Sequence, residues 1–294
     1  MSLFPGFENR RLTVDGIEIN AVVGPARDAP AVLLLHGYPQ THAIWHKVAP
    51  RLAERFNVVA SDLRGYGDSG KPATTADHAP YSKRVMATDQ VRLMGALGHD
   101  RFLLVGHDRG GRVAHRLAVD HPQAVRKVAV LDIAPTAAMY EQTTDAFARA
   151  YWHWFFLILP AHGPERMIGA DPKAYLREKM GESRARGVFA PEAWAEYERC
   201  FTPGAIHASC EDYRAAATVD LEHDRADRDA GRKVRAPLLA LWGANGVVER
   251  CFKPLDEWRR VADDVRGRAL PAAHYLPEEV PELLTAELEK FFGE

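Results

Sequence analysis

Short apolar runs alternate with stretches of helical spacing along the first half of the chain. Each run is continuous rather than alternating, and each ends at a glycine or a polar residue, which is typical of strands buried on both faces. The predicted strands are residues 32–35, 58–60, 102–105 and 127–131. Strands that alternate with helices predict a mostly parallel central sheet with helices on both faces, and ligands at the carboxyl ends of the strands.

The pattern changes at both ends of this region. Residues 11–23 alternate apolar and polar positions around Asp15-Gly16, which indicates a hairpin of two edge strands. Strand patterns resume at 237–241 and near 268–270, and a final helix is predicted at 281–292.

Between these parts, residues 136–232 carry aromatic and charged positions at helical spacing and no convincing strand. We therefore predict a core formed by residues 1–135 and 233–294, into which residues 136–232 are inserted as a helical cap.

Composition limits the classes of function. With 294 residues, 47% hydrophobic residues and a net charge of -2, the chain can bury a large core and offers no basic surface, so we expect no nucleic-acid or membrane partner. The start lacks the apolar core of a signal peptide. Three widely spaced cysteines, Cys200, Cys210 and Cys251, argue against a disulfide framework and fit a cytoplasmic location.

The segment Gly106-His107-Asp108-Arg109-Gly110 joins a predicted buried strand directly to a predicted helix. Glycines on both sides of Asp108 allow a sharp turn, the pattern of a nucleophile elbow in which aspartate replaces serine. The alternative is an ordinary turn in which Asp108 caps the helix.

An elbow nucleophile requires an acid and then a histidine later in the chain, each just past a strand. Asp132 follows the strand at 127–131, and His274 follows the last strand. Taken singly, Asp132 suits a helix cap and His274 a surface position, but their order favours catalysis. Glu249 is a poor substitute for the acid, so we assign that role to Asp132.

A carboxylate nucleophile suits displacement at a saturated carbon, because the product is an ester that water can open. His274, oriented by Asp132, is the predicted base. The backbone N–H groups of Tyr38 and Arg109 are the predicted oxyanion donors. Carbon–halogen bonds and epoxides both remain open as targets.

Two arginines favour a substrate that carries a carboxylate. Arg109 directly follows Asp108, and Arg112 lies at the same end of the predicted helix. Guanidinium groups bind carboxylates bidentately, which an epoxide does not require. The alternative for Arg112 is a solvent-facing position or an ion pair with an acidic loop.

No cofactor or metal site is predicted. The chain has no glycine-rich phosphate loop, and we find no carboxylate or cysteine partners at ligand spacing for His207 or His223.

Several segments together resemble the fluoroacetate dehalogenases, haloacetate dehalogenases of the α/β-hydrolase fold, from about residue 4 to residue 292. The segments are 36–40 (HGYPQ), 62–69 (DLRGYGDS), 106–112 (GHDRGGR), 151–154 (YWHW) and 212–217 (DYRAAA).

The resemblance implies hydrolysis of small haloacetates, with Asp108 as nucleophile and Arg109 and Arg112 holding the carboxylate. It also implies a halide pocket formed by the side chains His153, Trp154 and Tyr213. Without it, residues 151–156 suggest an aromatic core stripe and Tyr213 a packing residue. A homodimer is implied by the resemblance alone, because no segment indicates an interface.

The chain departs from the family pattern at two places, the first of which affects packing and the second the pocket. Tyr275 follows His274 where members often have phenylalanine, and no tryptophan occurs between Phe155 and Glu192. The second departure leaves open which haloacid is preferred. An epoxide hydrolase and a catalytically silent ligand-binding protein are the alternative functions.

Overall fold

The computed structural model describes residues 2–294, which form one eight-stranded sheet in the order β1-β2-β4-β3-β5-β6-β7-β8. The strands are β1 (Glu8–Val14), β2 (Ile17–Val23), β3 (Ala31–Leu35), β4 (Asn57–Ser61), β5 (Phe102–His107), β6 (Val125–Leu131), β7 (Leu238–Gly243) and β8 (Val265–Leu270). Only the β1–β2 and β2–β4 pairs are antiparallel. The mostly parallel sheet and the edge hairpin expected from the sequence are confirmed.

The register of the central strands brings their carboxyl ends together. Leu35 of β3 pairs with Gly106 of β5, and His107 pairs with Leu131 of β6. Leu131 in turn pairs with Leu241 of β7. The residues that follow these strands therefore meet at one edge of the sheet.

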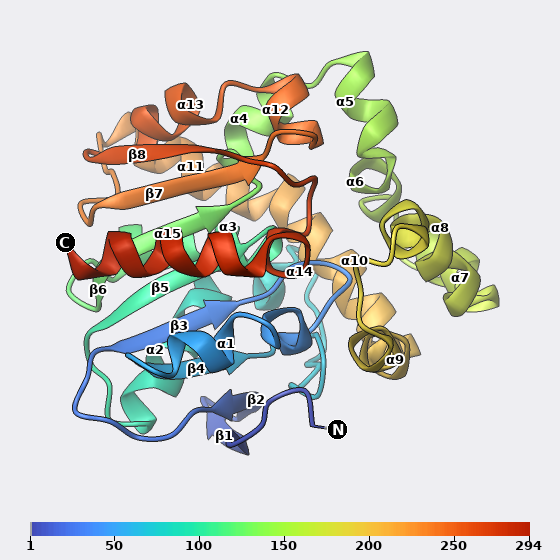
Figure 1. Ribbon diagram of the computed structural model, residues 1–294. Helices are drawn as coiled ribbons and strands as arrows, with labels where there is room; N and C mark the ends of the chain where they lie inside the picture. The colour runs from blue at the N-terminus through green and yellow to red at the C-terminus, as the bar shows by residue number, and fades with distance from the viewer. Residues whose placement is uncertain (1) are drawn as a thin grey trace.

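Helices cover both faces of the sheet (Figure 1). Each face of the sheet has its own cluster of buried apolar side chains. On one face lie α2 (Lys83–Ala96), α3 (Arg109–Asp120) and α13 (Pro254–Val261). On the other lie α1 (Ala49–Leu52) and α15 (Pro281–Gly293). Shorter elements are η1 (His42–Trp45), η2 (Ala79–Tyr81), α12 (Val247–Cys251) and α14 (Leu276–Glu279).

Two local expectations differ from the structure. The helical pattern from Trp45 to Phe56 is split into η1 and the one-turn helix α1, because Pro50 starts a new helical turn and has no N–H to continue the first. Helices α12 and α13 were not anticipated between β7 and β8, since both are short and Pro254 interrupts their apolar spacing.

The segment between β6 and β7 contains eight helices and, within the described part of the chain, no strand. Figure 1 shows α5 to α10 extending beyond the carboxyl ends of the strands. The helices are α4 (Thr136–Glu141), α5 (Asp145–Ala150), α6 (Trp152–Leu157), α7 (Gly163–Ala170), α8 (Pro172–Ala185), α9 (Pro191–Cys200), α10 (Pro203–Ala217) and α11 (Val219–Asp229). Across residues 2–294, no helix has the length and apolar character needed to span a membrane.

Candidate active site

Asp108 lies in the sharp turn between β5 and α3. Its φ of 49° and ψ of -114° form a strained conformation for a residue with a side chain. The turn depends on Gly106, because a Cβ there would lie 2.3 Å from the carbonyl oxygen of Gly110. A Cβ on Gly37 would likewise lie 2.4 Å from the Cβ of Asp108. The glycines thus let the chain bring Asp108 against the loop after β3.

The carboxylate of Asp108 does not cap α3. Its Oδ1 accepts a hydrogen bond from the backbone N–H of Tyr38 at 2.9 Å, and it makes no side-chain cap bond to the helix. Burial raises the pKa of Asp108, but the neighbouring side chains of His274, His107, Arg112 and Arg109 outweigh that effect and lower the pKa to about 2. Asp108 is therefore an ionised, buried carboxylate, and the capping alternative is wrong.

Asp132 and His274 meet beside this turn. His274 Nδ1 lies 2.6 Å from Asp132 Oδ2, and the N–H of Gly243 donates to Asp132 Oδ1 at 2.9 Å. The pKa of Asp132 is raised above its usual value, because the effect of burial exceeds the lowering by the hydrogen bond with His274. With Nδ1 held by the carboxylate, Nε2 of the imidazole is the nitrogen available for proton transfer. Glu249 instead accepts from Trp242 Nε1.

Arg109 is fully buried and held mainly by Asp212. Its Nε and Nη2 donate to the two carboxylate oxygens of Asp212 at 2.9 and 2.8 Å, and Nη2 also donates to the Asp212 carbonyl at 2.9 Å. The guanidinium lies over the Tyr213 ring, 4.1 Å from its centroid. Within the described residues, Nη1 has no hydrogen-bond partner.

Arg112 is also buried, which excludes the solvent-facing alternative. Its Nη1 donates to Thr136 Oγ1 at 2.9 Å, and its guanidinium lies 4.5 Å from the centroid of the Trp154 ring. Among residues 2–294, its Nε finds no acceptor. Each arginine therefore offers a single unpaired nitrogen, Nη1 of Arg109 and Nε of Arg112. A carboxylate bound here would accept one hydrogen bond from each arginine and could not form a bidentate pair with either one.

The three predicted halide-binding side chains form one buried aromatic group. Ring centroids are 5.9 Å apart for His153 and Tyr213 and 6.2 Å apart for Trp154 and Tyr213. His153 Nδ1, Trp154 Nε1 and the Tyr213 hydroxyl are all buried and make no hydrogen bond within the described chain. Burial lowers the pKa of His153 well below its usual value, so the imidazole is neutral.

An unpaired buried polar group costs about 1–3 kcal/mol. A purely structural aromatic stripe would not explain why three such groups occur in one cluster of neighbouring rings. Together with Arg109 Nη1 and Arg112 Nε, they indicate a site that a hydrogen-bond acceptor completes.

Asp212 is the important residue that the sequence did not identify. Besides Arg109, it pairs with the buried ammonium of Lys83, and it accepts from the Tyr66 hydroxyl at 2.6 Å. Burial raises the pKa of Asp212, but Arg109 and Lys83 hold it well below its usual range. In the sequence it belongs to the 212–217 segment that carries the family resemblance, but no role was assigned to it.

Replacing Asp212 by asparagine should destabilise the protein by about 3–5 kcal/mol, because Arg109 and Lys83 would remain buried without a counter-charge. Denaturant unfolding measures this change. The control is Asp68→Asn, which removes an ion pair to the half-exposed Arg199 and should cost about 1 kcal/mol or less. Equal losses for the two variants would contradict the role assigned to Asp212.

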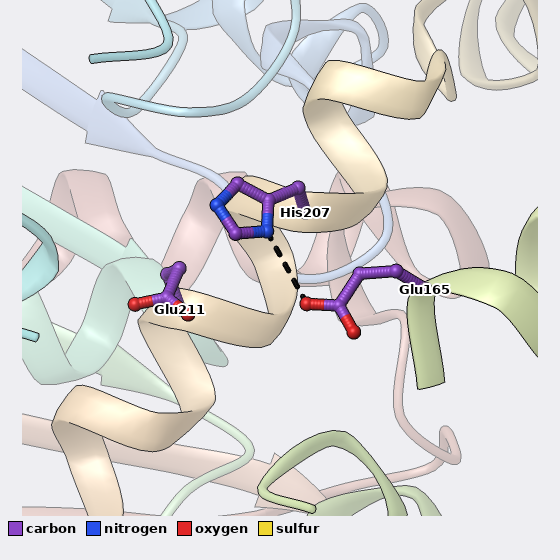
Figure 2. A group of neighbouring side chains, drawn as sticks. All are labelled: Glu165, His207 and Glu211. Carbon is purple, nitrogen blue, oxygen red and sulfur yellow. Dashed lines mark hydrogen bonds and ion pairs between the residues drawn. The ribbon is translucent and has the colours of Figure 1, made fainter. Parts of the chain in front are cut away.

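Outside this site, His207 lies with Glu165 and Glu211, and their potential ligand atoms are all within 4.8 Å of one another (Figure 2). The expectation that His207 lacks carboxylate partners is therefore wrong, because α7 folds back beside α10. Arg214 Nη1 already lies 2.7 Å from both carboxylates, which supplies the positive charge that a metal ion would bring. The absence of a metal site remains a prediction.

Comparisons with known proteins identify similar hydrolases. A fluoroacetate dehalogenase from Burkholderia sp is 46% identical over 99% of this chain and 96% of its own length. A soluble epoxide hydrolase from Corynebacterium sp. (strain C12) is 35% identical over 89% of this chain and 90% of its own. The crystal structure of ALR0039 from Nostoc sp PCC 7120, described as an α/β hydrolase, is 53% identical with a TM-score of 0.93, over 97% of this chain and 98% of that one.

These similarities confirm the resemblance expected from the sequence motifs. The family model described as the alpha/beta hydrolase fold matches residues 30–271, most of the chain from just before β3 to just after β8. The strand order, the elbow at Asp108 and the matched length lead to the same assignment: this chain belongs to the α/β-hydrolase family.

Proposed function

We propose that this enzyme hydrolyses the carbon–halogen bond of small haloacetates, including fluoroacetate and chloroacetate, to give glycolate and halide. The observation that carries this proposal is the set of buried, unpaired polar atoms near the ionised Asp108. Arg109 Nη1 and Arg112 Nε would bind the substrate carboxylate. The neutral His153, with Trp154 and Tyr213, would bind the departing halide.

In the first step, Asp108 Oδ2 attacks the methylene carbon, since Oδ1 is already held by the N–H of Tyr38. The new carbon–oxygen bond forms as the carbon–halogen bond breaks, and the halide leaves with the electron pair. Fluoride is a poor leaving group unless hydrogen bonds replace its hydration, which the indole N–H, the phenol and the imidazole can supply together.

In the second step, Nε2 of His274 takes a proton from water, and the resulting hydroxide attacks the side-chain carbonyl carbon of Asp108. Negative charge collects on Oδ1, where the Tyr38 N–H already donates at 2.9 Å and the Arg109 N–H is the second proposed donor. Collapse expels glycolate, whose alkoxide oxygen receives the proton from His274. Asp108 is left as a carboxylic acid, which loses the second water proton to solvent and becomes a carboxylate again. Asp132 keeps the imidazole oriented and stabilises its protonated form.

We also propose that residues 136–232 act as a cap over this site, separate from the core of residues 1–135 and 233–294. The cap supplies His153 and Trp154 from α6 and Tyr213 from α10, whereas the core supplies the nucleophile, acid and base. The homodimer and the cytoplasmic location stay predictions.

Halide release tests the proposal directly. Purified enzyme should release fluoride from fluoroacetate and chloride from chloroacetate, and failure with both would overturn the proposal.

The 35% identity with an epoxide hydrolase makes epoxides the second candidate substrate class. Diol formation from simple epoxides, unchanged by Arg112→Leu, would favour that alternative, because an epoxide has no carboxylate for Arg112 to bind. A silent ligand-binding protein would bind haloacetate without turnover.

Replacing Trp154 by phenylalanine should lower kcat for fluoroacetate about 10²-fold and lower it less for chloroacetate. The variant keeps an aromatic ring against Phe147 but removes the indole N–H, and fluoride needs hydrogen bonds more than chloride does. Steady-state rates for both substrates measure the difference. The control is Trp45→Phe, which removes another buried, unpaired indole N–H on the opposite face of the sheet and should leave the ratio unchanged. Equal losses for both substrates would argue against halide binding by Trp154.

A further inference from the structure

A cavity of about 160 Å³ lies where the core meets the inserted segment, between helices α3, α4, α11 and α13. Its lining includes Pro135 and Lys233, where the chain leaves and re-enters the core. From α3 it includes His115, which is seven residues beyond Asp108 and therefore about 10 Å further along the helix. The cavity is thus distinct from the candidate active site.

Much of the wall is apolar. Val119, Pro135, Ala138 and Val261 contribute from three different helices and the start of the insertion. An apolar cavity of about 150 Å³ holds a benzene ring. This space therefore suits an aliphatic or aromatic body of one six-membered ring.

One buried carboxylate gives the cavity a polar end. Glu257 on α13 is 5% exposed, and its Oε2 accepts no hydrogen bond from any described residue. The nearest cation is Arg260, whose Nη1 lies 3.4 Å away and whose side chain is 69% exposed. This ion pair with an exposed side chain gives Oε2 no hydrogen bond. Glu257 therefore indicates a ligand that brings its own N–H or O–H group.

His115 also borders the cavity and is neutral, because burial lowers its pKa to about 4. It does not add positive charge that would compete for Glu257.

The other charges of the wall are distributed by depth. Lys233 is exposed, and the half-exposed side chains of Arg228 and Arg232 pair with Glu141 and Asp227. Asp224 and Asp227 are more buried, but both are paired with Arg116 behind the wall. Glu257 is therefore the inner charge left for a ligand, and its sign favours a cation over a carboxylate.

We propose that this cavity is a second ligand site that binds a small cyclic alkylammonium ion, with the ammonium on Glu257 and the ring against Val119, Ala138 and Val261. The proposal does not depend on the reaction at Asp108. A ligand here would contact both ends of the inserted segment and α3, the helix that begins directly after Asp108.

Calorimetry with cyclohexylamine, cyclohexanol and cyclohexanecarboxylate at pH 7 tests this proposal. We expect the ammonium to bind at one site, at least about tenfold more tightly than the other two, because it alone pairs with Glu257. No binding of cyclohexylamine, or equal binding of the three compounds, would overturn the proposal without any variant being needed.

Two variants locate the site. Glu257→Gln should weaken cyclohexylamine binding at least about tenfold, and Ala138→Leu should abolish it by filling the space. Glu141→Gln is the matched control, since this lining acid is 40% exposed and already pairs with Arg228. Full-strength binding by folded Glu257→Gln would contradict the assignment. The Asp108→Asn protein should bind cyclohexylamine normally, which separates this site from the proposed dehalogenase activity.

Discussion

Replacing Asp108 by asparagine should lower halide release from fluoroacetate by about 10⁴-fold or more, because the attacking carboxylate oxygen is lost. The fold should persist. Asparagine is among the residues that best tolerate a positive φ such as the 49° observed at this position, and its amide oxygen can still accept from the N–H of Tyr38. Fluoride release and thermal unfolding of the same preparation measure the two effects.

The matched control is Asp77→Asn, which changes an exposed carboxylate in the loop before α2 and should leave activity unchanged. A single turnover of the wild-type enzyme in heavy-oxygen water provides a second check. Because the hydroxide attacks the side-chain carbonyl carbon, label should enter the Asp108 carboxylate. Label found only in glycolate after one turnover, or near-normal activity of the Asp108→Asn protein, would contradict the ester mechanism.

Replacing His274 by asparagine should stop turnover after the first step and leave the enzyme alkylated. The displacement needs only the carboxylate of Asp108, whereas opening of the ester needs a base for water. We expect one equivalent of fluoride per enzyme, steady turnover reduced about 10³-fold or more, and intact protein heavier by one carboxymethyl group. Mass spectrometry of the protein and a fluoride burst measure these outcomes together.

The control for this experiment is His99→Asn, which changes a histidine in the loop before β5, away from Asp132. It should turn over normally and carry no modification. If the His274→Asn protein released no fluoride at all, His274 would be needed for the first step. If the modification were found on a residue other than Asp108, the assigned nucleophile would be wrong.

Much of this site could be located from the sequence because parallel strands end at one edge of the sheet. Once residues 102–105, 127–131 and 268–270 are recognised as strands, Asp108, Asp132 and His274 follow them in order. The pairing of Asp132 with His274 at 2.6 Å is what that order predicts. The short helices α12 and α13 were missed because proline and short length weaken their periodicity.

The aromatic part of the candidate site was harder to predict. His153, Trp154 and Tyr213 were identified only through a family resemblance, since aromatic residues at helical spacing are also the normal content of a core. Whether Trp154 only packs against other side chains or also contacts substrate depends on how α6 and α10 are positioned over the sheet. No local sequence pattern determines that position.

By itself, the sequence determined the sheet, the elbow at Asp108 and the order in which Asp108, Asp132 and His274 follow their strands, because each follows from short-range patterns of apolar residues and glycines. Only the tertiary structure decided which guanidinium nitrogens of Arg109 and Arg112 are paired within the protein and which are left without a partner among the described residues. Asp212 lies more than a hundred residues from Arg109, yet it occupies two of the three guanidinium nitrogens and leaves Nη1 free. Such long-range pairing is set by where the fold places Asp212 of α10 relative to the start of α3, and local sequence carries no record of it.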